Sequence, residues 1–197
     1  MLASELRYRG FDVLTTLEPG GTPLGRRLRS AFLETEENVS PLAELLLFAA
    51  DRAQHVNFLI QPKLAEGKIV ISDRYADATF AYQGAGRGFD EKTVNQVINL
   101  ATEGLKPDLT LFFDISVDKA ILRTNTRTGD EAVKNRMDAE NVEFYERVRD
   151  AYLKIAAKEP KRFRVIDANG SIEGIKAKVL EIVTKFLNGK RKMENGK

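Results

Sequence analysis

Short apolar runs alternate with longer segments of helical period along this chain, and this alternation limits the folds open to it more than any other feature. Four runs are rich in β-branched and aromatic residues, and they lie at 11–17, 68–72, 109–115 and 163–166. Between them, apolar residues recur at the three- and four-residue spacing of helices. The pattern predicts an α/β fold in which a parallel sheet carries helices on both faces.

The segment between the first two runs gives the clearest helix signal. Ser40 and Pro41 suit the N-cap and first turn of a helix, and leucines and alanines then recur at helical spacing as far as Ile60. Further helices are expected near 90–103, 117–124, 140–158 and 171–187.

The length of 197 residues suits a single domain, which we place at 1–188. The stretch 124–137 is polar and weakly periodic, which predicts a mobile lid. The residues at 189–197 are polar and basic, which predicts a disordered tail.

The composition excludes several classes of function. A net charge of +2 implies no general attraction to nucleic acid. The chain has no Cys and one His, which excludes disulfides, thiolate chemistry and a histidine-based metal cluster. Without an apolar run long enough for a membrane span or a signal peptide, we expect a cytoplasmic protein that uses no membrane.

Charged residues follow two of the apolar runs, where ligands bind in open parallel sheets. Glu18 leads into a Pro-Gly-Gly turn that can approach a ligand closely. Asp73 and Arg74 end the second run, where a carboxylate suits magnesium and a guanidinium suits phosphate. A plain turn and a structural ion pair are equally compatible with these residues.

Other polar and aromatic residues form a second group of candidates. Phe48 and Arg52 are neighbours on one helix face, where they can bind a flat base, although Phe48 can also pack at the core edge. Neutral polar groups follow Arg74, and basic side chains surround 124–137. The neutral groups are Thr79, Tyr82 and Gln83, and the basic ones are Arg123, Arg127, Lys134 and Arg136. A solvated basic loop is the alternative for the basic set.

Taken in order, these segments resemble thymidylate kinase of the bacterial type with a basic lid. The motifs are EPGGT, LLFAADRAQH, SDRYADATFAYQGAGRG, KPDLTLFFDI, the basic lid and VEFYERVRDAYLKIA. The resemblance implies a nucleoside-monophosphate-kinase fold that transfers a phosphoryl group from ATP to dTMP with Mg²⁺, usually as a homodimer. A kinase of another nucleoside or nucleotide, and an inactive nucleotide-binding protein of the same fold, are the alternatives.

The resemblance also implies roles at the base and sugar. Phe48 corresponds to the ring that stacks on thymine, and Arg52 to the guanidinium that recognises the base edge. Thr79 and Gln83 fall where polar groups meet the base. Tyr82 falls where an aromatic ring packs under the deoxyribose.

At the phosphates, the resemblance makes Arg74 the ligand of the monophosphate and Asp73 the carboxylate near magnesium. Arg123, Arg127 and Arg136 correspond to lid arginines that engage ATP. Glu18, in the loop of the EPGGT motif, is expected to bind the substrate as well.

The chain departs from the family at two places. Leu17 stands where an Arg usually precedes the EPGG motif, and no G-x-x-x-x-G-K-[S/T] phosphate-binding loop is present. In the family the strand before that loop lies centrally, so its absence predicts two unpaired strand edges. Either the natural protein has about 20 more residues before Met1, or the chain binds nucleotide without phosphorylating it. For the chain as printed we expect no catalysis.

Overall fold

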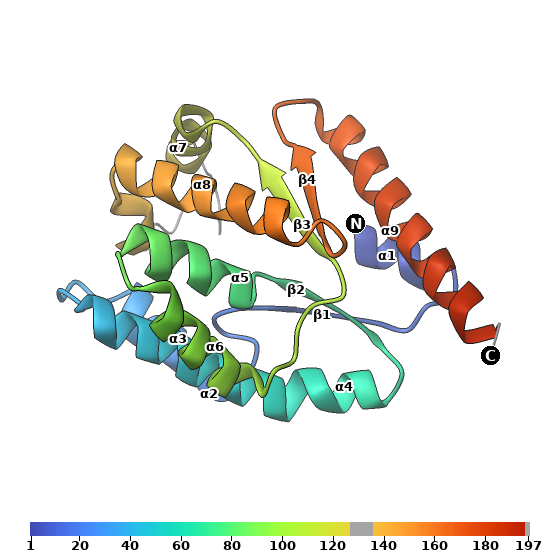
Figure 1. The fold of residues 1–197 in the computed structure, drawn as a ribbon, viewed down its shortest axis with the longest axis horizontal. Helices are drawn as coiled ribbons and strands as arrows, with labels where there is room; N and C mark the ends of the chain where they lie inside the picture. The colour runs from blue at the N-terminus through green and yellow to red at the C-terminus, as the bar shows by residue number, and fades with distance from the viewer. Residues whose placement is uncertain (127–135, 196–197) are drawn as a thin grey trace.

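The computed structural model describes residues 1–126 and 136–195 of the chain (Figure 1). Helices and strands alternate as the apolar pattern predicts. In chain order the elements are α1 (Leu2–Tyr8), β1 (Val13–Leu17), α2 (Pro23–Leu33), α3 (Pro41–His55), η1 (Val56–Ile60), α4 (Gln61–Ala65), β2 (Ile69–Asp73), α5 (Ala76–Thr79), η2 (Phe80–Gly86), α6 (Glu91–Thr102), β3 (Thr110–Asp114), α7 (Val117–Asn125), η4 (Arg136–Ala139), α8 (Val142–Lys158), β4 (Phe163–Asp167) and α9 (Ile172–Asn195).

The strands pair in parallel, as two separate ribbons. β1 pairs with β2 from Val13 opposite Ile69, and β3 pairs with β4 from Thr110 opposite Phe163. Among the described strands, β2 and β3 do not pair with each other, so each keeps one free edge. The expected parallel α/β architecture and the expected unpaired edges are both confirmed.

Helices pack on both faces of the strands (Figure 1). On one face α1 and α9 bury a cluster that includes Leu6, Val13, Ile166 and Val179. On the other face, Phe112 of β3 stacks on Tyr152 of α8 with ring centroids 4.6 Å apart. Leu111 packs against the first cluster and its neighbour Phe112 faces α8, so adjacent residues of β3 point to opposite layers, as the pleat requires.

Side-chain caps begin four of the longer helices. The side chains of Thr22, Ser40, Asp90 and Asn141 each accept a backbone N–H from the first turn of α2, α3, α6 and α8. Each cap satisfies an amide that the helix cannot pair internally. The starts of these helices are therefore encoded locally.

Three segments differ from the sequence-based expectation. Neither helix α2 nor the helical segment 76–86 was expected. Helix α9 continues to Asn195, so the tail predicted to be disordered from 189 is helical over most of its length. Lys190 helps to hold it, because its amine lies 2.8 Å from the Asp108 carboxylate. Among the described helices, none combines the length and the apolar character that crossing a bilayer requires.

An ion pair connects the segment after β2 with the start of the other ribbon. Arg162, just before β4, donates to both carboxylate oxygens of Asp77 at 2.7 and 2.8 Å. Thr110 of β3 donates its hydroxyl to the same carboxylate at 3.0 Å. Both charged side chains are only 15% exposed, so the pair ties the two ribbons together away from most solvent.

We expect Arg162→Met to lower the free energy of unfolding by about 2 kcal/mol, because it strands the carboxylate of Asp77 in a mostly buried site. Urea unfolding at neutral pH measures the change. The matched control is Lys158→Met, which breaks an exposed pair with Glu91 and should cost less than about 0.5 kcal/mol. Equal losses in the two variants would contradict a special role for the buried pair.

Candidate active site

The loop from Glu18 to Thr22 leaves the carboxyl end of β1 and enters α2. Gly20 has a φ of +115°, a conformation that L side chains rarely adopt, so glycine is required there. The loop lies against the polar face of α3, which contributes Asp51, Arg52 and His55. All three of these side chains are buried.

Arg52 connects three segments of the chain. Its Nε donates to Glu18 at 2.8 Å, one terminal nitrogen donates to the Thr79 hydroxyl at 2.8 Å, and the other donates to the Tyr75 carbonyl at 3.2 Å. A guanidinium has five N–H donors, so two N–H groups remain for another acceptor. Arg52 can therefore hold the protein and also bind a carbonyl group of a ligand.

His55 supports the same carboxylate from the next turn of α3. Its Nδ1 lies 2.8 Å from Glu18, and its Nε2 lies 2.7 Å from the Thr16 hydroxyl. A Cβ on Gly21 would lie 2.4 Å from Nε2, so the loop packs on this ring only because residue 21 is glycine. The position is structural, since both ring nitrogens are engaged within the protein.

Asp51 holds the same loop at Gly20. Its Oδ1 accepts the Gly20 N–H at 3.0 Å, while Oδ2 is buried without a hydrogen-bond partner among the described residues. Burial raises the pKa of this carboxyl and outweighs the hydrogen bond from Gly20. A Cβ on Gly25 would lie 2.3 Å from Oδ1, so Gly25 makes room for the contact.

Asp73 and Arg74 lie at the carboxyl end of β2, as predicted, and both are exposed. Arg74 has a φ of 67°, which is unusual for a residue with a side chain and costs about 1 kcal/mol. This backbone places its guanidinium carbon 4.2 Å from the centre of the Tyr82 ring. A strained residue at the end of a strand is typical of a functional site.

Phe48 lies one turn from both Glu44 and Arg52 on α3. Its ring is half-buried and meets Phe32 edge-on, with centroids 4.9 Å apart. Thr79 and Gln83 lie one turn apart on the facing helical segment. Thr79 bonds to Arg52 and Gln83 bonds to Glu44, so the structure brings these predicted residues together around Phe48.

Glu44 is a site residue whose role the sequence did not reveal. Its fully buried carboxylate accepts bonds from Gln83 at 2.8 Å, from Arg87 at 3.0 and 3.1 Å, and from Arg136 at 2.5 Å. Burial alone would raise the pKa of Glu44, but the bonds from Arg87, Gln83 and Arg136 outweigh it and lower the pKa. The spacing of Glu44, Phe48 and Arg52 was the one signal available.

Two of the predicted lid arginines, Arg123 and Arg136, contact different parts of the structure. Arg123 donates to the Ala168 carbonyl at 3.1 Å, in the connection that follows β4. Arg136 bonds to Glu44 and to the Phe32 carbonyl, beside the candidate base site. Arg127 and most of the predicted lid at 124–137 lie outside the described residues.

The arrangement can bind a flat ring at one end and an anion at the other. Phe48, Arg52, Thr79 and Gln83 offer a ring face and polar groups, and the exposed Arg74 offers a cation. No group of three or more acidic or histidine side chains in the described chain can hold a metal by itself. A single carboxylate such as Asp73 still suits Mg²⁺, which keeps several waters and binds substrate phosphates.

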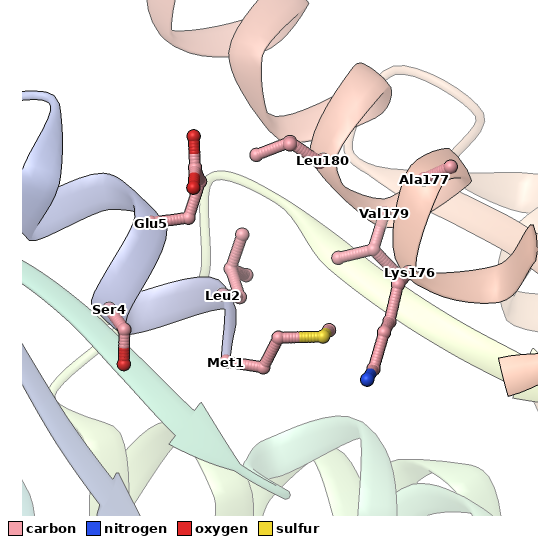
Figure 2. A pocket seen from close by; sticks show the side chains of 8 residues that line it. All are labelled: Met1, Leu2, Ser4, Glu5, Lys176, Ala177, Val179 and Leu180. Atoms are coloured by element: carbon pink, nitrogen blue, oxygen red, sulfur yellow. The ribbon is translucent and has the colours of Figure 1, made fainter. Parts of the chain in front are cut away.

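A groove of about 380 Å³ lies elsewhere, between α1 and α9 (Figure 2). Leu2, Val179 and Leu180 line it, and Glu5 and Lys176 supply its charged side chains. It contains none of the predicted site residues. A second groove along α9 also lies apart from them.

Comparison with known proteins gives a consistent result. The family model described as thymidylate kinase matches residues 1–179. The thymidylate kinase of Nitratidesulfovibrio vulgaris is 45% identical over 183 residues, covering 91% of this chain and 85% of that protein. That of Desulfosudis oleivorans is 47% identical over 173 residues, covering 86% of this chain and 81% of that protein. The crystal structure of thymidylate kinase from Ehrlichia chaffeensis superposes with a TM-score of 0.72 at 32% identity, covering 92% of this chain and 87% of that one.

We expect Gly25→Ala to lower the free energy of unfolding by about 1 to 3 kcal/mol, because the added methyl group collides with Asp51. Gly84→Ala is the matched control, since a Cβ there would meet only Val94 at 3.7 Å. Urea unfolding measures both. Adding Asp51→Ala to the Gly25 variant should recover part of the loss, whereas simple additivity would show that the two residues do not share one contact.

Proposed function

The chain belongs to the thymidylate kinase family, and on that basis we propose that the natural protein transfers the γ-phosphoryl group of ATP to dTMP, giving dTDP and ADP. One observation carries the proposal, which is the family match over residues 1–179. Curated relatives named thymidylate kinase at 41–47% identity support it. They favour this function over phosphorylation of another nucleotide and over an inactive binding protein. A cytoplasmic location, where both nucleotides are available, is part of the proposal.

In this proposal the base binds beside Phe48. The half-buried ring offers a face for stacking on thymine, and Arg52 directs its two remaining N–H groups to a carbonyl oxygen of the base. Thr79 and Gln83 meet the base edge from the facing segment. Tyr82, whose ring lies under the Arg74 guanidinium, packs against the deoxyribose.

The monophosphate lies at the carboxyl end of β2. Arg74 binds its oxygens, and the ring of Tyr82 keeps the guanidinium in place. Asp73 holds Mg²⁺, which neutralises charge on the phosphates when it is bound. Glu18 acts beside them by fixing Arg52, because its carboxylate is used within the protein.

The ATP side rests on the basic residues Arg123, Arg127 and Arg136. Within the described residues, Arg136 bonds to Phe32 through Nε and to Glu44 through one terminal nitrogen, which leaves its other terminal nitrogen for a ligand. The printed chain carries no G-x-x-x-x-G-K-[S/T] pattern, so we assign the phosphates of ATP to no backbone loop. Phosphoryl transfer needs no covalent intermediate, and the protein acts by positioning and by charge neutralisation.

We expect Phe48→Ala and Arg74→Ala each to weaken dTMP binding by at least about tenfold, because each removes a principal contact worth about 1.4 kcal/mol or more. Titration calorimetry with dTMP measures the dissociation constants. Arg9→Ala is the control, since it removes a guanidinium from an exposed pair with Glu5. Unchanged dTMP affinity in both site variants would refute this placement of the substrate.

The chain also exposes an apolar surface suited to a homodimer. Leu42 and Leu46 lie one turn apart on α3 and are 54% and 52% exposed. Phe58 of η1 and Leu100 of α6 are 71% and 83% exposed, and α3 packs against both elements. Large apolar side chains grouped on neighbouring elements favour a protein interface. We place the dimer contact there.

Leu46→Glu should shift the protein to monomer, because it buries an unpaired charge in the proposed interface. Sedimentation velocity measures the change over a range of concentrations. Leu122→Glu is the control, since Leu122 is 63% exposed on α7, away from this surface. A wild-type monomer, or a dimer unaffected by Leu46→Glu, would exclude this interface.

A further inference from the structure

Two hydrogen-bonded contacts flank Phe48 on α3. One turn before it, Glu44 accepts the side-chain amide of Gln83, and one turn after it, Arg52 donates to the hydroxyl of Thr79. Thr79 and Gln83 are themselves four residues apart on one helical segment, α5 continued by η2. Glu44 is also tied to that segment through Arg87, just beyond η2. The half-buried ring of Phe48 therefore lies between two hydrogen-bonded contacts, Glu44 with Gln83 and Arg52 with Thr79.

The contact with Glu44 determines which way the amide of Gln83 points. A side-chain amide has a donor end and an acceptor end of nearly the same shape, so its neighbours decide the orientation. Glu44 is an acceptor only, because Arg87 and Arg136 keep its carboxylate ionised. The NH₂ group of Gln83 must therefore face Glu44, with Oε1 directed away from it.

The carbonyl oxygen of Gln83 remains available to a ligand. No hydrogen bond to Oε1 is found within the described chain, whereas the NH₂ group at the other end of the amide donates one hydrogen bond to Glu44. Gln83 as a whole is only 1% exposed, but Oε1 is not among the fully buried side-chain atoms that lack a partner in that part of the chain, so the little exposure that Gln83 has includes this oxygen. An acceptor in a fixed position, beside an aromatic face, selects for a ligand that carries a donor.

We infer that Glu44 is a specificity-determining positioning residue, which holds the Gln83 oxygen toward the base and so selects pyrimidines that carry an N3–H. Thymine and uracil have that donor. Cytosine has a lone pair at N3, so two acceptors would face each other without a proton between them. The inference rests on the proposed function, which brings the base of dTMP to Phe48.

The surrounding charges explain why a carboxylate suits position 44. A glutamine there could either donate or accept, so it would leave the amide of Gln83 free to rotate. Arg87 and Arg136 secure Glu44 from two sides, and Glu140 holds Arg87 in turn at 2.6 Å. Glu44 acts through Gln83 and contacts no reacting atom.

The test compares dissociation constants of dTMP, dUMP and dCMP, measured by titration calorimetry on wild type and Glu44→Asp. Aspartate keeps the charge for the flexible Arg87 and Arg136 but is one methylene too short to hold Gln83. The ratio of the dCMP to the dTMP constant should fall by about tenfold, which is the effect of releasing one hydrogen-bonded orientation. The ratio of dUMP to dTMP should not change, because both bases carry N3–H.

Two further variants complete the design. Glu140→Gln disturbs the same charge cluster without touching Gln83, and it should keep the wild-type preference for dTMP over dCMP. Gln83→Leu leaves Glu44 with Arg87 and Arg136, and it should lose that preference even if the aspartate variant fails to fold.

The outcomes separate the two proposals. A wild-type protein that does not bind dTMP refutes the proposed function. If the wild type binds dTMP but Glu44→Asp leaves the dCMP to dTMP ratio unchanged, the role of Glu44 is refuted and the proposed function is not. An unchanged dCMP to dTMP ratio in Gln83→Leu also overturns the inference, because that variant removes the acceptor. A fall in the dUMP to dTMP ratio of Glu44→Asp that parallels the fall in the dCMP to dTMP ratio overturns it as well, because it indicates a general loosening of the site.

Discussion

The buried guanidinium of Arg52 is the interaction on which the rest of the site depends. Withdrawing a charge from water is costly unless a partner charge and hydrogen bonds replace the lost solvent. Glu18 supplies the partner charge, and Thr79 and Tyr75 accept two further bonds. Because these partners come from the loop after β1 and from the segment after β2, one side chain sets the spacing between two strand ends and α3.

That requirement explains several local features that otherwise look unrelated. The loop must lie flat on α3 for Glu18 to reach Arg52, and Gly21 and Gly25 are small because side chains there would collide with His55 and Asp51. Asp51 then fixes the loop through the Gly20 amide, although burial raises the pKa of its carboxyl. The loop is held in its conformation by side-chain contacts rather than by regular secondary structure.

Much of this architecture could be predicted from the sequence, since apolar period and helix caps are local signals. The four strands and the helix that begins at Ser40 and Pro41 are examples. Helix α2 was missed because its first turn follows a Pro-Gly-Gly stretch that equally suits a plain turn. The helical segment 76–86 was missed because glycines near its end oppose a helix, and packing against α8 overrides that preference.

Some residues of the candidate site could likewise be predicted from the sequence, and others could not. Phe48 and Arg52 were found through their spacing on one helix, and Asp73 and Arg74 through their place after a strand. The role of Glu44 was not predictable, because its partners Arg87 and Arg136 are 43 and 92 residues away in the chain. Tertiary pairings of this kind leave no periodic trace, and the family resemblance, which assigns Arg136 to ATP, does not indicate its bond to Glu44.

The two ends of the site also differ in rigidity, and the difference has a physical reason. Around Phe48, the polar side chains Glu44, Arg52, Thr79 and Gln83 are buried and bonded in two pairs, so a base bound there as proposed meets groups that need little reorganisation. At the strand end, Asp73 and Arg74 are exposed, and the Arg74 guanidinium lies over the Tyr82 ring without a hydrogen bond to a carboxylate of the described residues. A guanidinium without a competing carboxylate keeps its hydrogen-bonding capacity for phosphate. In the proposed complex, fixed groups therefore recognise the base, while the charged end is free to adapt as the phosphoryl group is transferred.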